Sequence, residues 1–60
     1  MKYYKHASYY EYYRVYPDGS YEWISRSYPI WQKELSRAFE KDVLWDVVEI
    51  SEKEMFLMLL

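Results

Sequence analysis

The sequence predicts a small α+β domain, in which a three-stranded, mainly antiparallel sheet carries two helices on one face in the order β-β-α-β-α. Three observations predict this class. A turn signal separates two strand-forming runs near the N-terminus, apolar residues recur at helical spacing in the middle, and a capping box stands near the C-terminus. A chain of 60 residues has room for one domain, covering residues 1–60.

Residues 9–26, YYEYYRVYPDGSYEWISR, predict a β-hairpin folded about Pro17-Asp18-Gly19. Pro presets φ for the second position of a type I turn, Asp suits the next position, and Gly supplies the left-handed residue that closes a bulged hairpin. The flanking Tyr, Val, Trp and Ile residues favour strands. Residues 1–8 leave two alternatives, since Tyr3 and Tyr4 either extend the first strand or lie across the sheet.

The register of this hairpin decides which side chains share a face, because side chains alternate along a strand. The expected pairs run from Tyr16 opposite Ser20 to Tyr10 opposite Arg26. We expect the face with less charge to form the core, and it holds Tyr9, Tyr13, Val15, Tyr21 and Trp23, with Glu11 and Ser25 toward the open end. The other face, also rich in Tyr, holds Tyr10, Tyr12, Arg14, Tyr16, Glu22, Ile24 and Arg26.

The middle of the chain predicts a helix and then a third strand. Pro29 suits a first helical turn, and apolar residues at Ile30, Trp31, Leu35, Ala38 and Phe39 predict an amphipathic helix over residues 30 to about 41. Residues 43–50, VLWDVVEI, have the β-branched and aromatic content of a strand. In the alternative interpretation, the helix continues through residue 45.

The C-terminal stretch predicts a second helix. Ser51 and Glu54 match a capping box ahead of a helix over residues 52 to about 60. Its residues 55–60, MFLMLL, are apolar almost all round, which is typical of a helix buried on most sides. A 60-residue monomer offers little to surround such a helix, so we expect at least one of Phe56, Leu59 and Leu60 to make intermolecular contacts. The residues expected near the core are Tyr13, Trp23, Leu35, Phe39, Val47 and Phe56.

Composition excludes several classes of function. The chain has no Cys, which excludes disulfides and cysteine-based zinc sites, and with only His6 we expect no metal, cofactor or catalysis. Nine Tyr, three Trp and two Phe supply the apolar area that so small a domain needs. The N-terminal residues have no apolar signal region, and the C-terminal apolar run is too short to span a bilayer. We therefore expect a cytoplasmic chain with no membrane partner.

The Tyr- and Arg-rich hairpin face and the C-terminal helix are the candidate binding surfaces. Tyr and Arg are favoured anchors at protein interfaces, and the same residue types grip single-stranded nucleic acids. A net charge of −2 favours a protein partner over a phosphate backbone. We therefore expect a non-enzymatic protein–protein interaction module and homodimer that occupies a partner's surface, of the inhibitor or adaptor kind that phages and mobile elements carry. The alternative is a single-stranded nucleic-acid-binding protein. The candidate partner-binding residues are Tyr10, Tyr12, Arg14, Tyr16, Arg26, Phe56, Leu59 and Leu60.

Each of these groups also has a plainer structural interpretation. The Tyr side chains can simply cover the sheet or pair across strands. His6 has no orienting partner or nucleophile at a defined spacing, so a partly exposed residue at a strand edge or in the N-terminal tail is the better interpretation. The acidic residues match neither a calcium loop nor a paired-carboxylate site, and solvated charge explains them. These acidic residues are Asp42, Asp46, Glu49, Glu52 and Glu54.

Overall fold

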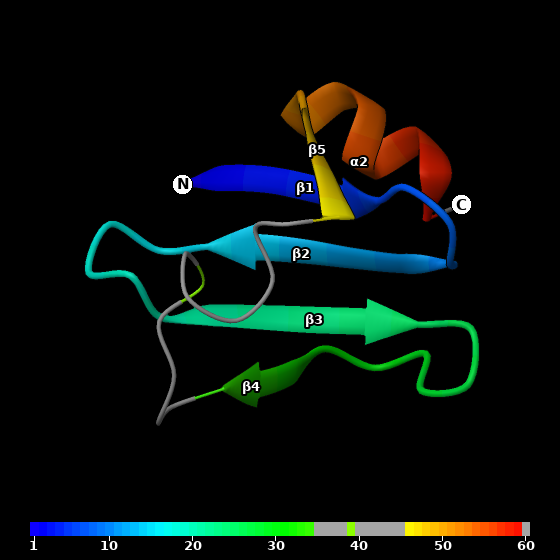
Figure 1. The fold of residues 1–60 in the computed structure, drawn as a ribbon, viewed down its shortest axis with the longest axis horizontal. Helices are drawn as coiled ribbons and strands as arrows, with labels where there is room; N and C mark the ends of the chain where they lie inside the picture. Colours follow the sequence, from blue (N-terminus) through cyan, green and yellow to red (C-terminus); the bar gives the residue numbers. More distant parts are fainter. Residues whose placement is uncertain (35–38, 40–45, 60) are drawn as a thin grey trace.

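The computed structural model of the chain describes residues 1–34, 39 and 46–59. Its strands form one five-stranded sheet in the order β4-β3-β2-β1-β5, with every neighbouring pair antiparallel, and helix α2 follows the last strand (Figure 1). The elements are β1 (Lys2–His6), β2 (Glu11–Val15), β3 (Tyr21–Ser25), β4 (Gln32–Glu34), β5 (Val47–Ile50) and α2 (Glu52–Met58).

The expected three-stranded sheet with two helices on one face is therefore wrong. The N-terminal residues form a strand of their own, β1, which pairs with β2 on one side and with β5 on the other. Residues 32–34, expected in a helix, form strand β4 along the outer edge of β3. Ile30 and Trp31, expected in the same helix, lead into β4 outside any helix. Of the other residues of that expected helix only Phe39 is described. Residues 43–45 of the expected third strand, and with them the interpretation that the helix continues through residue 45, also lie outside the described residues.

A tight turn explains why β4 forms instead of a helix. The Ser25 N–H donates to the Tyr28 carbonyl (3.1 Å), and the Tyr28 N–H donates to Ser25 Oγ (3.1 Å), so the chain returns alongside β3. There the ring of Trp31 lies 4.1 Å from the Arg14 guanidinium carbon, which holds the returning chain against the sheet. Ladder hydrogen bonds to the β3 edge and this contact outweigh a helical spacing of apolar residues.

The predicted hairpin is confirmed, with the expected register from Val15 opposite Tyr21 to Glu11 opposite Ser25. The turn closes through the Gly19 N–H and the Tyr16 carbonyl (3.0 Å), and Gly19 has a φ of 92°, where a side chain would strain the backbone. This hairpin could be predicted from the sequence because Pro17, Asp18 and Gly19 have defined conformational preferences in turns.

The predicted capping box is also confirmed. Ser51 Oγ accepts from the Glu54 N–H (3.1 Å), while the Ser51 N–H donates to Glu54 Oε1 (3.4 Å). The expectation that α2 is buried on most sides is wrong for the single chain. Only Met55 is buried, whereas Phe56 is 68% exposed, because this short helix touches the sheet along one line beside β1.

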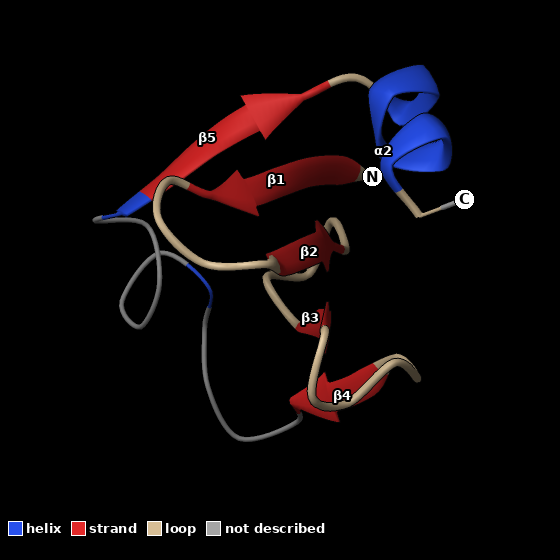
Figure 2. Cartoon of the chain, turned by 90° about the vertical axis from the view of Figure 1, so that its right-hand side faces the viewer, coloured by secondary structure: helices blue, strands red, loops and turns tan. Residues whose placement is uncertain are grey.

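The sheet is strongly twisted, and the alternation of side chains along its strands gives it two faces. In Figure 2, β1 and β5 run across the view while β2 and β3 point along it. We call one side the Phe39 face; it presents Tyr4, Tyr13, Val15, Tyr21, Trp23 and Val47 around Phe39. We call the other side the α2 face; it presents Tyr3, Lys5, Tyr12, Arg14, Glu22, Ile24, Lys33, Val48 and Ile50 beside α2.

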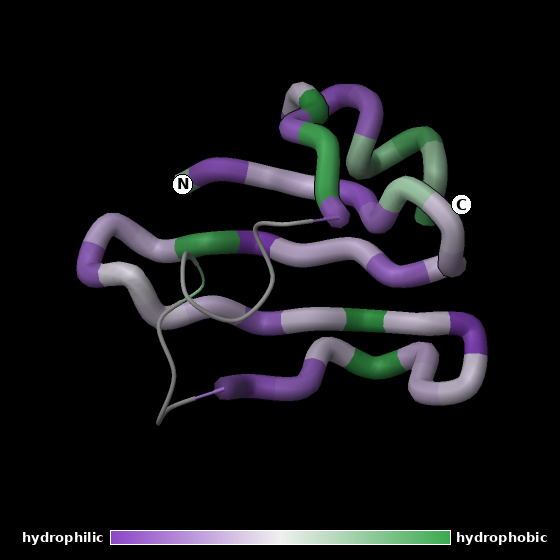
Figure 3. Tube along the Cα trace, in the orientation of Figure 1, coloured by the Kyte–Doolittle hydropathy of each residue, from purple (hydrophilic) through white to green (hydrophobic). Residues whose placement is uncertain are grey.

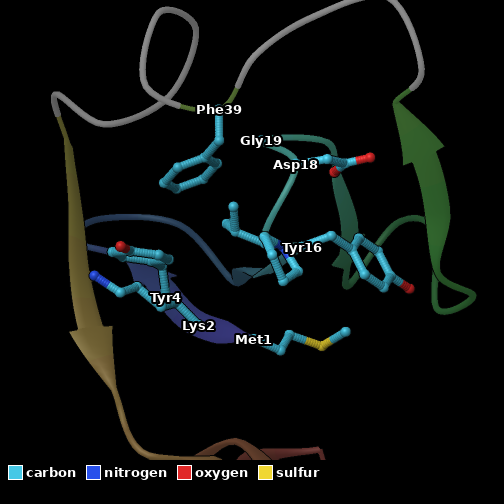
Figure 4. A pocket seen from close by; sticks show the side chains of 9 residues that line it. Met1, Lys2, Tyr4, Tyr16, Asp18, Gly19 and Phe39 are labelled. Atoms are coloured by element: carbon cyan, nitrogen blue, oxygen red, sulfur yellow. The ribbon is translucent and has the colours of Figure 1, made fainter.

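The core lies on the Phe39 face. Phe39 is 2% exposed, and its ring centroid lies 4.7 Å from that of Tyr4, 5.6 Å from Tyr13 and 5.4 Å from Tyr21. Figure 4 shows the Phe39 ring facing Tyr4 at the edge of a hollow. This confirms Tyr13 and Phe39 as core residues. Trp23 and Val47, also expected there, are partly buried against them.

Two expected core positions are wrong, and one is outside the described residues. Phe56 is exposed on α2. Tyr9 is also exposed, because it precedes β2 in the turn from β1, where its ring lies 4.8 Å from the ring of His6. Leu35 belongs to the part of the chain that the structure does not describe.

Candidate functional site

A groove crosses the α2 face between helix α2 and the residues that lead into β4. It consists of two adjoining pockets of about 410 and about 430 Å3, which share Leu59. The first pocket is lined by Tyr3, Arg14, Trp31, Glu52, Met55, Phe56 and Leu59. The second is lined by Tyr10, Ile24, Ser25, Arg26, Pro29, Met58 and Leu59.

Arg14 and Trp31 form a fixed platform in the first pocket. Arg14 Nε donates to Glu22 Oε1 (2.8 Å), and the Tyr16 hydroxyl donates to the same oxygen. The guanidinium carbon lies 4.1 Å from the centre of the Trp31 ring. Hydrogen bonds from Arg14 and Tyr16 lower the pKa of the Glu22 carboxyl, and donation to Glu22 raises the pKa of Tyr16. Because Glu22 neutralises Arg14, this end of the groove can contact a ligand through the surface of Arg14 and Trp31, but it contributes little net charge.

Arg26 marks the other end of the groove. Its guanidinium carbon lies 4.5 Å from the centre of the Tyr10 ring, and its backbone N–H donates to the Tyr10 carbonyl (3.2 Å). Among the described residues the ion pair found is that of Arg14 with Glu22, so Arg26 meets no carboxylate there. Tyr10 is itself 63% exposed. This pair therefore presents a ring and an unneutralised cation together.

Helix α2 supplies the apolar wall. Met55 is 4% exposed and anchors the helix, whereas Phe56, Met58 and Leu59 line the groove and remain exposed. Figure 3 shows that hydrophobic residues gather in the second half of α2, while the Tyr-rich strands have intermediate hydropathy. The wall is therefore the most hydrophobic part of the groove.

The structure brings five of the predicted partner-binding residues into this groove: Tyr10, Arg14, Arg26, Phe56 and Leu59. Tyr12 lies on the same face, in the row between Lys5 and Ile24. Tyr16 stands outside the groove and supports it through Glu22. Leu60 lies outside the described residues.

Sequence reasoning missed several groove residues. Tyr3 was missed because β1 was not recognised as a strand, and Trp31 because it was assigned to a helix. The expected pairing of Ile24 with Tyr12 did place Ile24 on the correct face, but an isolated Ile gives no binding signal. Met55 and Met58 were visible only as members of an apolar run.

A second hollow, of about 500 Å3, lies beside Phe39 (Figure 4). Its polar side chains include Lys2, Asp18 and Tyr16. The Asp18 carboxylate already accepts from the Ser20 N–H (2.9 Å) and hydroxyl (2.6 Å), which lowers its pKa and leaves it a structural role in the turn. We therefore do not assign chemistry to this hollow.

His6 also has a structural role. Its Nδ1 accepts from the backbone N–H groups of Ser8 (3.0 Å) and Tyr9 (3.1 Å) and so closes the turn after β1. Within residues 1–34, 39 and 46–59, no group of three or more His, Cys, Asp or Glu side chains is placed to hold a metal ion. Asp42 of the acidic set lies outside these residues.

No protein-family model, curated protein or solved structure matches this chain. In the part of the chain that the structure describes, no helix is long and apolar enough to cross a membrane. The groove is therefore the feature of the molecule that suggests a function.

Proposed function

We propose that the chain is a non-enzymatic protein-binding module that uses the groove on the α2 face. The observation that supports this most is the exposure of large apolar side chains along a preformed concave surface. Phe56 and Leu59 stand exposed on the helical wall, and the exposed ring of Tyr10 lies at the far end. Contiguous exposed apolar surface on a soluble protein marks interaction sites.

The composition of the groove supports the proposal. A standard interface buries about 800 Å2 on each partner, which is roughly a sixth of the 4710 Å2 of surface of this chain. The groove, flanked by α2 on one side and by Pro29 and Trp31 on the other, lies at the centre of the surface proposed for such an interface. Its content of Tyr, Trp, Met and Arg is that of interface cores.

The groove is also preorganised. Glu22 and Trp31 hold Arg14, and Tyr10 lies beneath Arg26, before any partner arrives. Ordering a rotamer-rich side chain on binding costs about 0.5–1.5 kcal/mol, so side chains that are already held reduce this loss. This supports binding of a partner without rearrangement of the groove.

Self-association is the second part of the proposal, and it uses the edge of β5 instead of the groove. No described residue pairs with the outer edge of this strand. The Ala7 N–H donates to the Asp46 carbonyl (2.8 Å), so by alternation the backbone groups of Val47 and Glu49 point away from β1. A second copy paired about Val48 places Glu49 opposite Val47 of the partner subunit and avoids opposing two Glu49 carboxylates.

Selection from a random peptide library of about twelve residues tests the groove. The wild-type chain should enrich peptides, and Phe56→Asp should weaken their binding by about tenfold or more, because it places a charge on the groove wall. Leu57→Asp is the matched control, since Leu57 has a similar exposed fraction on the same helix (62% against 68% for Phe56) but does not line the groove. Equal loss in both variants, or no enriched peptide, would contradict the proposal.

Sedimentation equilibrium tests the self-association. We expect a monomer–dimer equilibrium in the micromolar range, weakened by Val48→Lys, which adds a charge to the edge. A strict monomer at all these concentrations would remove the homodimer and leave the groove proposal standing.

A further inference from the structure

The α2 face carries positive charge in a chain whose net charge is −2. Four basic side chains lie on this face or in its groove, against two acidic ones. The basic residues are Lys5, Arg14, Arg26 and Lys33, and the acidic residues are Glu22 and Glu52. The strands of the Phe39 face have the opposite balance, with Lys2 against Glu11, Glu34 and Glu49.

We infer that the groove binds an acidic, apolar peptide segment of a partner protein. This inference rests on the proposed function and specifies its ligand. The segment places apolar side chains against Phe56 and Leu59 and a carboxylate on Arg26. Arg26 is the group suited to that carboxylate, because Glu22 already neutralises Arg14. A carboxylate on an Arg can form two parallel hydrogen bonds, which adds geometric specificity.

The charge distribution disfavours a second copy of the chain as occupant of the groove. A two-fold dimer through the groove would bring identical surfaces together, so both positive α2 faces would oppose each other. Like charges across an interface suppress association. Self-association through β5 does not meet this obstacle, because its edge lies outside the groove.

The groove is also less suited to a nucleic-acid strand than to a peptide. Each nucleotide brings a phosphate, whereas Glu52 lines the first pocket and Glu22 lies beneath it. The groove does offer rings on which bases can stack, but a single unneutralised Arg gives little electrostatic attraction for a repeating phosphate backbone. A peptide with one acidic residue beside apolar side chains fits this groove better, because the groove combines an apolar wall with one unneutralised Arg, Arg26.

The peptides enriched by the wild-type chain test this inference. We expect Asp and Glu to be enriched beside Leu, Phe or Trp. Arg26→Glu should lower the affinity for these peptides about tenfold, and a new selection with this variant should enrich peptides that contain Lys or Arg. Lys2→Glu is the matched control, because it changes the net charge equally on the Phe39 face, and its affinity should remain within about twofold of wild type.

The outcomes separate this inference from the proposed function. The acidic ligand would be overturned, and a protein-binding groove would remain, in either of two cases. The enriched peptides could depend on Phe56 but lack acidic residues, or their affinity could be unchanged by Arg26→Glu. Absence of any peptide dependent on Phe56 would overturn both. An oligothymidylate that displaces the peptides at low salt, with affinity falling as salt rises, would overturn the peptide ligand in favour of a single-stranded nucleic acid.

Discussion

On the Phe39 face, one aromatic ring closes a core: Phe39 contacts the rings of Tyr4, Tyr13 and Tyr21. The α2 face has a similar supply of Tyr, but α2 inserts only Met55 and leaves Phe56 exposed beside a groove. Composition therefore does not distinguish the two faces. The two faces differ in where an apolar side chain packs on the sheet. Phe39 packs against Tyr residues of three strands, whereas Met55 packs beside β1.

This difference assigns the two faces separate roles. A domain of this size buries only about 60% of its unfolded surface, so one well-packed face must supply much of its stability. The other face can then remain open without unfolding the chain. Its open side chains are held by local pairs such as Arg14 with Glu22 and Arg26 with Tyr10, which keep their shape without a closed core.

The largest expected effect compares two Phe residues, one on each face. Phe39→Ala should lower the free energy of unfolding by about 3–5 kcal/mol, because it empties the centre of the core. Phe56→Ala should change it by less than about 0.5 kcal/mol, because the side chain is already exposed. Urea denaturation followed by circular dichroism measures both. Equal effects would show that the two faces contribute alike to stability.

A second prediction compares two Tyr hydroxyls at alkaline pH. Burial and donation to Glu11 raise the pKa of Tyr13, and donation to Glu22 raises that of Tyr16. The stabilising contribution of each is complete below about pH 10, the ordinary Tyr pKa, and is lost as pH rises toward the folded pKa. We expect stability to fall above that pH.

Tyr13→Phe should flatten this alkaline fall more than Tyr16→Phe, because Tyr13 is buried in the core on the Phe39 face. At neutral pH, Tyr13→Phe should cost about 1 kcal/mol through its lost hydrogen bond to Glu11 (2.5 Å). The midpoints of urea denaturation, measured across about pH 7–11 for the wild type, Tyr13→Phe and Tyr16→Phe, provide the comparison. A steeper fall in Tyr13→Phe than in wild type would contradict it.

The elements that could be predicted from the sequence have signals within a few consecutive residues. Asp18-Gly19 defined the hairpin turn, and Ser51 with Glu54 defined the start of α2. The lower charge of one hairpin face correctly indicated the buried side for Tyr13 and Tyr21. Of the groove residues, Arg14 and Arg26 followed from the same register, because side-chain alternation is strict.

The elements that were missed depend on distant partners. β1 acquires its interior place in the sheet by pairing with β5, more than forty residues away, and nothing within KYYKH indicates that partner. β4 is a polar segment, QKE, whose strand conformation comes from the edge of β3 and from Trp31 on Arg14. The groove needs Tyr3 and Trp31 from these two regions, so its shape could not be predicted.

A third prediction concerns the ion pair that supports the α2 face. Glu22→Gln should lower the free energy of unfolding by about 1 kcal/mol, since it weakens the bonds from Arg14 and Tyr16 at a partly exposed site. It should also weaken peptide binding by leaving Arg14 less firmly held. Denaturation and peptide titration, monitored side by side, separate the two effects.

The same substitution predicts a change at acid pH. The lowered pKa of Glu22 means that its stabilising contribution is present above about pH 4.5, its ordinary value, and is lost as pH falls through the folded pKa. Glu22→Gln should therefore reduce the acid loss of stability. Glu49→Gln on the Phe39 face is a control, and an equal reduction in that variant would show that the effect is general charge repulsion.

The smallest expected effect lies at the turn between β1 and β2. His6→Ala removes the acceptor for the N–H groups of Ser8 and Tyr9, which water can replace because the turn is exposed, so we expect a loss of about 0.5–1 kcal/mol. Amide hydrogen exchange at these two positions should accelerate. His6→Asn should restore part of the protection, since a side-chain carbonyl can accept from the same turn. Unchanged exchange in His6→Ala would show that the strand pairing, and not the imidazole, holds the turn; unchanged peptide affinity in both variants would show that the α2 face keeps its shape independently of it.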